Sequence, residues 1–371
     1  MSIRRLFIAP AEALLRSKET GSLLRRIKDI RQLIRPVAGT YDGELQYYGD
    51  LPKVLGRGNV FLFGEFHPHL HARRVARTSP YPSQHGVARP TSLTESEVRD
   101  RIGSVDAVLV STRAGERGEL VRALARERGI PVALFDFADH HANYGAKDIR
   151  KELTRGFIEG RDYDLYFKKD LPLGYGAERI VPLCPAPVRP ESYRFPAVAK
   201  DQDIFYSGRP RPDLQADRGE LVYAVKDAFL DAVVLEHESR GSFMTTAEYW
   251  RHLARSRIAL SPSGKVWDSY RHCETGLAPH TVLVAPKPYV ETAGPPLRDG
   301  VNAILYDTEL RDGRYHLKDA FALLEKIRYY LQHPDAATAM ADHWARDVRA
   351  GHTVLARSRY IVDAMERIFG G

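Results

Sequence analysis

The residues best suited to chemistry lie where an apolar run of the C-terminal half gives way to a charged one. Residues 258–276 read IALSPSGKVWDSYRHCETG, so Ser263, Gly264 and Lys265 follow the apolar run directly. Backbone N–H groups in such a turn of small residues, with a lysine beside them, can bind an anion. We therefore predict an anion site at this turn.

The continuation of the same stretch has helical spacing and carries Arg271 and Glu274, three residues apart and thus on one helix face. An arginine there can pair with phosphate oxygens, and a carboxylate can accept both hydroxyl protons of a ribose. The same spacing is also that of an ordinary surface ion pair. The residues alone leave both interpretations open.

Two groups in the N-terminal half offer proton-transfer chemistry. GEFHPHLH places Glu65 and His67 after the apolar run NVFLF, and DFADHH places Asp139 and His140 after IPVALF. A carboxylate or a histidine at a strand end can take the proton of a reacting hydroxyl. Acids and histidines are also common as plain loop residues, and loops rich in histidine can bind Zn²⁺ or Mn²⁺. These four residues are the candidates for a catalytic base.

The elements that must position these residues repeat along the chain. Short apolar runs alternate with amphipathic, helix-like stretches, for example VDAVLVST followed by RAGERGELVRALARERG. This alternation is typical of parallel sheets covered by helices. A proline-rich stretch, CPAPVRPESYRFPAVAKDQ, interrupts it once and then the cycle resumes. We predict an α/β protein with two Rossmann-like, doubly wound domains that face a cleft, with ligands outside the carboxyl ends of the strands.

The predicted organisation has five parts. They are an N-terminal helical segment packed on the first domain (1–58), an N-terminal Rossmann-like domain (59–187), a linker (188–202), a C-terminal Rossmann-like domain (203–350) and a closing helix (351–371), for which a return to the N-terminal domain is one option.

Composition sets the class of protein and of partner. The 371 residues are 43% hydrophobic and 28% charged, with a net charge of +7, which describes a globular chain that favours anionic partners. Two cysteines give no disulfide framework and fit a reducing cytoplasm. The opening MSIRRLFIAPAEALL lacks a clear cleavage site, so we expect no signal peptide, and no apolar run is long enough to span a membrane.

The C-terminal part, from DIFYSGRPRP through SYRHCETGLAPHTVLVAP to LLEKIRYYLQHP and HTVLARSRYI, resembles GT-B glycosyltransferases. It is most similar to their glycosyltransferase family 1-like, CgeB-type branch and has some exostosin-like similarity. The resemblance covers about residues 203–362. It implies that Glu274 binds the ribose of a nucleotide-sugar donor and that Arg271 and Lys265 contact its diphosphate. It also implies that Gly208 and Arg209 contact the diphosphate or the base.

The resemblance further implies a transferase without a metal or other cofactor, with the nucleotide-sugar as substrate and a glycan, lipid-linked or small-molecule acceptor. The commoner family pattern has a second glutamate eight residues before the first, where this chain has Val266, so the stereochemistry stays open. We expect no nucleic-acid partner and a cytoplasmic protein. Its basic N-terminal stretch could contact the inner membrane face.

Two alternatives belong to other classes. A metal-dependent hydrolase would use the histidine- and aspartate-rich strand ends as ligands, but it would leave the C-terminal half unexplained. A non-catalytic polyanion-binding protein would fit the positive charge, but the basic residues are dispersed and no nucleic-acid motif is present.

Overall fold

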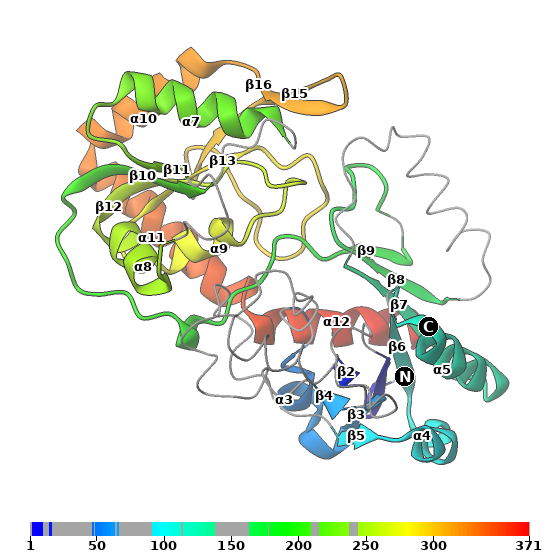
Figure 1. The fold of residues 1–371 in the computed structure, drawn as a ribbon. Coiled ribbons are helices and arrows are strands. Elements are labelled where there is room, and N and C mark those ends of the chain that lie inside the picture. Colours follow the sequence, from blue (N-terminus) through cyan, green and yellow to red (C-terminus); the bar gives the residue numbers. More distant parts are fainter. Residues whose placement is uncertain are drawn as a thin grey trace, which may run out of the picture.

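The computed structural model describes residues 2–9, 15–16, 47, 49–63, 65–66, 91–112, 114–137, 163–176, 178–208, 215–236 and 244–370. Within them, the chain forms two lobes, each built on a parallel sheet with helices against it (Figure 1). The predicted α/β class with two doubly wound domains is confirmed.

The N-terminal lobe contains a seven-stranded parallel sheet in the order β5-β3-β1-β6-β7-β8-β9. Its strands are β1 (Leu6–Ala9), β3 (Val60–Phe63), β5 (Thr91–Leu93), β6 (Ala107–Ser111), β7 (Val132–Asp136), β8 (Leu165–Lys168) and β9 (Ile180–Pro182). The central strands are short apolar runs that are buried throughout, as expected when both faces of a parallel sheet are covered.

Strand β1 corrects one prediction. Residues 1–58 were expected to be a helical segment, but Leu6–Ile8 pair with Val60–Leu62 on one side and Leu6–Ala9 pair with Ala107–Val110 on the other. These four residues form a central strand of the sheet, and every one of them is buried. A four-residue strand is too short to show periodicity. Only its partners, which are far away in the sequence, define it.

The helices and minor strands of this lobe are α3 (Leu51–Leu55), α4 (Glu95–Arg101), α5 (Gly115–Glu127) and the two-residue pair β2 (Leu15–Arg16) and β4 (Glu65–Phe66). Thr94 caps α4 in a capping box with Glu97. Buried residues of α5, including Val121 and Leu124, pack into the core on one face of the sheet.

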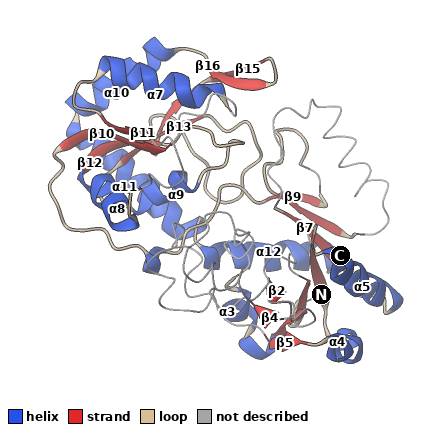
Figure 2. Ribbon diagram, in the orientation of Figure 1, coloured by secondary structure: helices blue, strands red, loops and turns tan. Residues whose placement is uncertain are grey.

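The C-terminal lobe contains a five-stranded parallel sheet in the order β11-β10-β12-β13-β14. Its strands are β10 (Gln202–Gly208), β11 (Val233–Glu236), β12 (Ser256–Leu260), β13 (Val282–Pro286) and β14 (Ile304–Tyr306). Its helices are α7 (Ala216–Ala228), α8 (Thr246–Arg255), α9 (Tyr270–Leu277), α10 (Ala320–Gln332) and α11 (Pro334–Gly351). Helices α7 and α10 lie on one side of the sheet and α8 and α9 on the other (Figure 2).

Two details of this lobe bear on the sequence patterns. Thr245 is the N-cap of α8, and it forms a capping box with Glu248. A hairpin of β15 (Thr308–Arg311) and β16 (Arg314–Leu317), which the apolar pattern did not reveal, follows β14 and packs on α7.

The chain crosses between the lobes twice, and backbone hydrogen bonds connect the two crossing segments. The segment between β9 and β10 pairs with the start of α12 (Val354–Phe369): Val188 N donates to the His352 carbonyl, and Val354 N donates to the Val188 carbonyl. Helix α12 then runs back along the N-terminal lobe (Figure 1). Its side chains Ile361, Val362, Ala364 and Met365 belong to the core formed with β1, β3 and β6.

Among the described residues, none of the helices combines the length and the apolar character that crossing a membrane requires. Both cysteines, Cys184 and Cys273, are buried free thiols.

Candidate donor site

The strand order of the C-terminal sheet reverses at β10, which lies between β11 and β12. In open α/β sheets, ligands bind in the crevice at such a reversal, outside the carboxyl ends of the strands. Gly208 is the last residue of β10, and Ser263 and Gly264 follow the end of β12. Three residues predicted for one site therefore lie at the two strand ends that border this crevice.

Two guanidinium groups face these glycines. A Cβ atom on Gly208 would lie 3.2 Å from Nη2 of Arg271, and one on Gly264 would lie 3.7 Å from Nη2 of Arg218. The guanidinium of Arg271 also stacks over the Tyr206 ring at 5.6 Å. Burial, together with the positive charge of Arg271, lowers the pKa of Arg218. Two partly buried positive charges thus stand at the crevice within electrostatic reach of each other.

Arg218 was not predicted from the sequence. It stands early in α7, and its Nε donates to the Ser263 carbonyl at 2.8 Å. An acid at position 217 and a glycine at 219 give the stretch the look of an ordinary helix start. A basic residue in the first turn opposes the helix dipole, and this was the available signal that Arg218 serves something outside its helix.

The turn after β12 is held by a buried hydrogen-bond network. Asp217 Oδ2 accepts from the Ser263 hydroxyl at 2.9 Å, from the Ser263 N–H at 3.3 Å and from the Tyr306 hydroxyl at 2.7 Å. Tyr289 donates in turn to the Ser263 hydroxyl at 3.3 Å. Ser263 was predicted to offer its N–H to an anion, but in the structure that N–H faces a carboxylate. Its observed contacts fix the turn in place.

Glu274 is 7% exposed, which rules out the surface-pair interpretation of Arg271 and Glu274. Its Oε1 accepts a hydrogen bond from the Tyr193 hydroxyl at 3.0 Å, and its Oε2 accepts one from the Tyr249 hydroxyl at 3.3 Å. Tyr249 is also in hydrogen-bonding contact with Arg271. The charged face of α9 is therefore enclosed by aromatic rings.

Burial raises the pKa of Glu274, while the hydrogen bond from Tyr193, the charge of Arg271 and the hydrogen bond from Tyr249 all lower it. The net shift is upward. These three neighbours therefore oppose the effect of burial without cancelling it.

Helix α9 is fixed in place by its own buried polar groups and by α11. His272 contacts the Ser261 hydroxyl at 2.8 Å and the Trp267 carbonyl at 3.1 Å, and burial lowers the pKa of His272 to about 4. The indole N–H of Trp344 donates to the His272 carbonyl at 2.7 Å. A neutral histidine and a buried tryptophan thus set the position from which Arg271 projects.

Gly276 lies inside α9, at a point where a side chain would have no room. A Cβ atom there would approach Val348 Cγ2 to 2.6 Å and Trp344 Cδ1 to 2.9 Å. Gly276 is needed because α11 packs directly against α9 at this point.

The other predicted residues lie apart or outside the description. Lys265 is exposed, and its carbonyl accepts a hydrogen bond from Gln215 at 2.9 Å. Arg209, His67, Asp139 and His140 lie outside the described residues. Glu65 stands in β4, and only its backbone is described.

Asp136, at the end of β7 beside the second group of candidates, is buried and paired. Its carboxylate accepts from the Tyr166 hydroxyl at 2.6 Å and lies 3.0 Å from Lys168 Nζ. These contacts give Asp136 a role in holding the strand ends of the N-terminal lobe.

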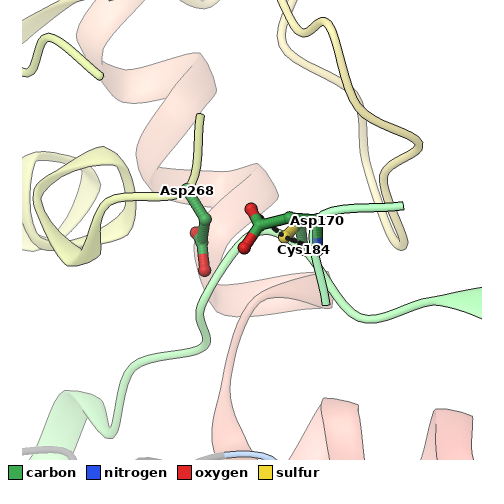
Figure 3. Close-up of side chains that lie close together, drawn as sticks. All are labelled: Asp170, Cys184 and Asp268. Atoms are coloured by element: carbon green, nitrogen blue, oxygen red, sulfur yellow. Dashed lines mark hydrogen bonds between the residues drawn. The ribbon is translucent and has the colours of Figure 1, made fainter. Parts of the chain in front are cut away.

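One group of side chains in the described part of the chain has metal-ligand geometry. Asp170, Cys184 and Asp268 place an oxygen, a sulfur and an oxygen within 4.8 Å of one another at the lobe junction (Figure 3). Lys169 Nζ, however, lies 3.6 Å from Asp170 Oδ2 and 3.8 Å from Asp268 Oδ2. Asp268 also accepts from Ala186 N at 2.8 Å. The ammonium group of Lys169 already supplies a positive charge beside both carboxylates, so the contacts describe an ion cluster between the lobes.

With this geometry, the chain can be compared with known proteins. Residues 221–363 match the family described as Glycosyl transferase-like. Anabaena Alr3699/HepE, solved in complex with UDP, has a TM-score of 0.54 at 12% identity, covering 99% of this chain and 100% of the other. A glycosyltransferase from Rickettsia africae ESF-5 has a TM-score of 0.54 at 12% identity, covering 99% and 98%.

The chain has the GT-B glycosyltransferase fold. The family match overlaps almost all of the stretch that carried the resemblance, and the recognition made from the sequence is confirmed at the level of the GT-B fold. The narrower CgeB-type and exostosin-like similarity stays a prediction. None of the curated proteins is matched significantly by the sequence.

Proposed function

We propose that this GT-B protein transfers a sugar from a nucleotide-sugar donor, bound in the C-terminal lobe, to a hydroxyl of an acceptor bound from the N-terminal lobe. The observation that carries the proposal is the pair of guanidinium groups, Arg218 and Arg271, beside two glycines at the strand reversal. Two like charges held together at a crevice favour a dianionic ligand, and glycines allow such a ligand close to the backbone.

In this proposal the diphosphate lies between Arg218 and Arg271, and the ribose hydroxyls are bound by Glu274. The two guanidinium groups supply the charge that stabilises a leaving nucleoside diphosphate, which supports a reaction without a metal ion. Anabaena Alr3699/HepE has been solved with UDP and with UDP-glucose. A uridine diphosphate sugar is therefore the first donor to test.

The chemistry needs a base for the acceptor hydroxyl. Glu65, His67, Asp139 and His140 stay the predicted candidates, because they follow strands of the lobe that faces the donor site. A glycan, lipid-linked or small-molecule acceptor, the cytoplasmic location and the contact of the basic N-terminal stretch with a membrane stay predictions as well.

The first experiment measures thermal unfolding of the protein with UDP, GDP, ADP, CMP and dTDP, each with and without a chelator. A ligand present at one hundred times its dissociation constant stabilises the folded state by about 2.7 kcal/mol, which is readily detected. We expect one nucleoside diphosphate to stabilise the protein clearly, with no effect of the chelator. No response to any nucleotide, combined with destabilisation by the chelator, would favour a metal-dependent hydrolase instead.

A pair of variants then tests the site. Glu274→Gln keeps an acceptor oxygen for one of the two tyrosines and presents its NH2 group to the hydroxyl of the other, which can accept, but it removes the charge. We therefore expect the fold to persist and the affinity for the preferred nucleoside diphosphate to fall at least tenfold. Glu325→Gln, on the exposed side of α10, is the matched control and should bind normally. Equal affinity of the two variants would remove Glu274 from the donor site.

A further inference from the structure

A tyrosine from the interdomain segment reaches into the candidate donor site. Tyr193 lies between β9 and β10, 81 residues before Glu274, and its hydroxyl donates to Glu274 Oε1 at 3.0 Å. Tyr193 is itself 7% exposed. The linker was predicted only as a spacer, yet it contributes a direct contact to the carboxylate assigned to the ribose.

The opposite oxygen is held from another element. Tyr249 of α8 donates to Glu274 Oε2 at 3.3 Å. An ionised carboxylate can accept about four hydrogen bonds, so two donors, one on each oxygen, leave capacity for two more. The two adjacent hydroxyls of a ribose are two such donors. The tyrosines thus occupy half of the acceptor capacity and restrict the direction of the other half.

We infer that Tyr193 and Tyr249 are positioning residues for the donor: they orient the Glu274 carboxylate so that it accepts both ribose hydroxyls. This inference rests on the proposed function. It assigns to the interdomain segment a part in recognising the ribose.

The Tyr193 ring packs in a cluster with two other aromatic rings, so the direction of its hydroxyl is set before a ligand arrives. It stacks on Phe195 with ring centres 6.0 Å apart and planes 15° apart, and it lies 5.4 Å from Trp250 of α8. A carboxylate that is already oriented loses less conformational freedom when it binds the ribose. The benefit of Tyr193 therefore appears as affinity for ligands that carry a ribose.

The same hydroxyl affects the charge of Glu274. The titratable and charged groups around this carboxylate are Tyr193 from the interdomain segment, Tyr249 from α8, and Arg271 and Cys273 from α9 itself. Burial raises the pKa of Glu274, and the hydrogen bond from Tyr193 is the first of the opposing effects. Without that hydroxyl the pKa of Glu274 rises further, so the carboxylate takes up a proton at a higher pH.

The test compares wild type with Tyr193→Phe by titration calorimetry, using UDP, or whichever base binds best in the panel above, and inorganic pyrophosphate, which has no ribose. We expect Tyr193→Phe to weaken UDP binding about tenfold and to leave pyrophosphate binding unchanged. The hydrogen bond that is lost orients only the carboxylate proposed to bind the ribose, and pyrophosphate has no ribose. The pH at which UDP affinity declines should move upward in the variant. Tyr223→Phe, at a half-exposed tyrosine of α7, is the matched control.

The outcomes separate cleanly. If wild type binds no nucleoside diphosphate, the proposed function fails and the inference fails with it. If wild type binds UDP but Tyr193→Phe binds it equally well with the same pH dependence, the inference alone is overturned. An equal loss for UDP and pyrophosphate, or a lower melting temperature with unchanged affinities, would reduce Tyr193 to a structural residue. Combining Tyr193→Phe with Glu274→Gln should cost less than the sum of the two changes, because both act through one contact.

Discussion

A substitution at Gly276 should displace helix α9 without changing any residue that is proposed to contact the donor. Replacing a helical glycine by alanine normally stabilises a helix by about 1 kcal/mol. In Gly276→Ala, the new methyl group would lie 2.6 Å from Val348 Cγ2, 2.9 Å from Trp344 Cδ1 and 3.0 Å from Trp344 Nε1. Both neighbours are completely buried, and the indole is hydrogen-bonded to the His272 carbonyl.

The expected magnitude follows from these contacts. Overpacking a core costs about 1–3 kcal/mol, and three contacts at or below 3.0 Å place this change at the upper end. After the gain in helix propensity is subtracted, we expect a net loss of about 2 kcal/mol in the free energy of unfolding. Because α9 must shift away from α11, Arg271 and Glu274 move with it. Nucleoside diphosphate affinity should therefore fall together with stability.

A second helical glycine gives the control. In Gly219→Ala the new methyl group would meet only the Tyr223 ring, at 3.8 Å, which is ordinary contact. This variant should gain about 1 kcal/mol, so the two substitutions are expected to have opposite signs. Urea unfolding, followed by circular dichroism, measures both. If Gly276→Ala is as stable as wild type, the close approach of α9 and α11 described here is wrong.

Three further predictions use other contacts. Nη1 of Arg189 donates to both oxygens of buried Asp50, at 2.8 and 2.9 Å, and Arg189→Met removes this partner. Urea unfolding should show a loss of about 3 kcal/mol in stability, the lower end for a broken buried pair, because Lys53 Nζ lies 3.1 Å from Asp50 Oδ1. No loss would contradict the pairing. Burial lowers the pKa of both His272 and His352 to about 4, so the unfolded chain takes up protons first and stability falls as pH drops from about 6.5 towards 4. In His352→Gln, the loss of unfolding free energy between pH 7 and pH 4.5 should be smaller than in wild type by about 2–3 kcal/mol. An unchanged loss would contradict the lowered pKa of His352. Arg218→Met should weaken nucleoside diphosphate binding at least tenfold in calorimetry and leave the free nucleoside unaffected, whereas equal losses for both would refute a phosphate contact.

The sequence was a good guide to the second sheet because each of its strands is an apolar run bounded by turn residues, as in IALSPSG and TVLVAP. It failed for β1, where four residues follow a basic start and the strand exists only through its pairing with residues far along the chain. The β15–β16 hairpin was missed for a related reason: its residues are mostly polar and partly exposed, so no hydrophobic alternation marks it.

The sequence likewise predicted some residues of the candidate site and missed others. Gly208, Arg271 and Glu274 could be placed together because each stands at a strand end or on the first helix after one, and topology brings such positions to one edge. Tyr193 and Tyr249 could not, because their contact with Glu274 depends on how the linker and α8 pack around α9. The buried environment of Glu274 was likewise invisible, because charge and spacing describe a helix face without telling what covers it.

Helix α12 has a consequence for how the protein is made. The core of the N-terminal lobe includes Ile361, Val362, Ala364 and Met365, which follow the whole C-terminal lobe in the sequence. The N-terminal lobe therefore cannot complete its core until the chain has been synthesised through α12. Until then an apolar groove beside β1 and β3 stays open. Truncation before residue 361 should leave this groove uncovered, and a separately supplied α12 segment should be able to fill it.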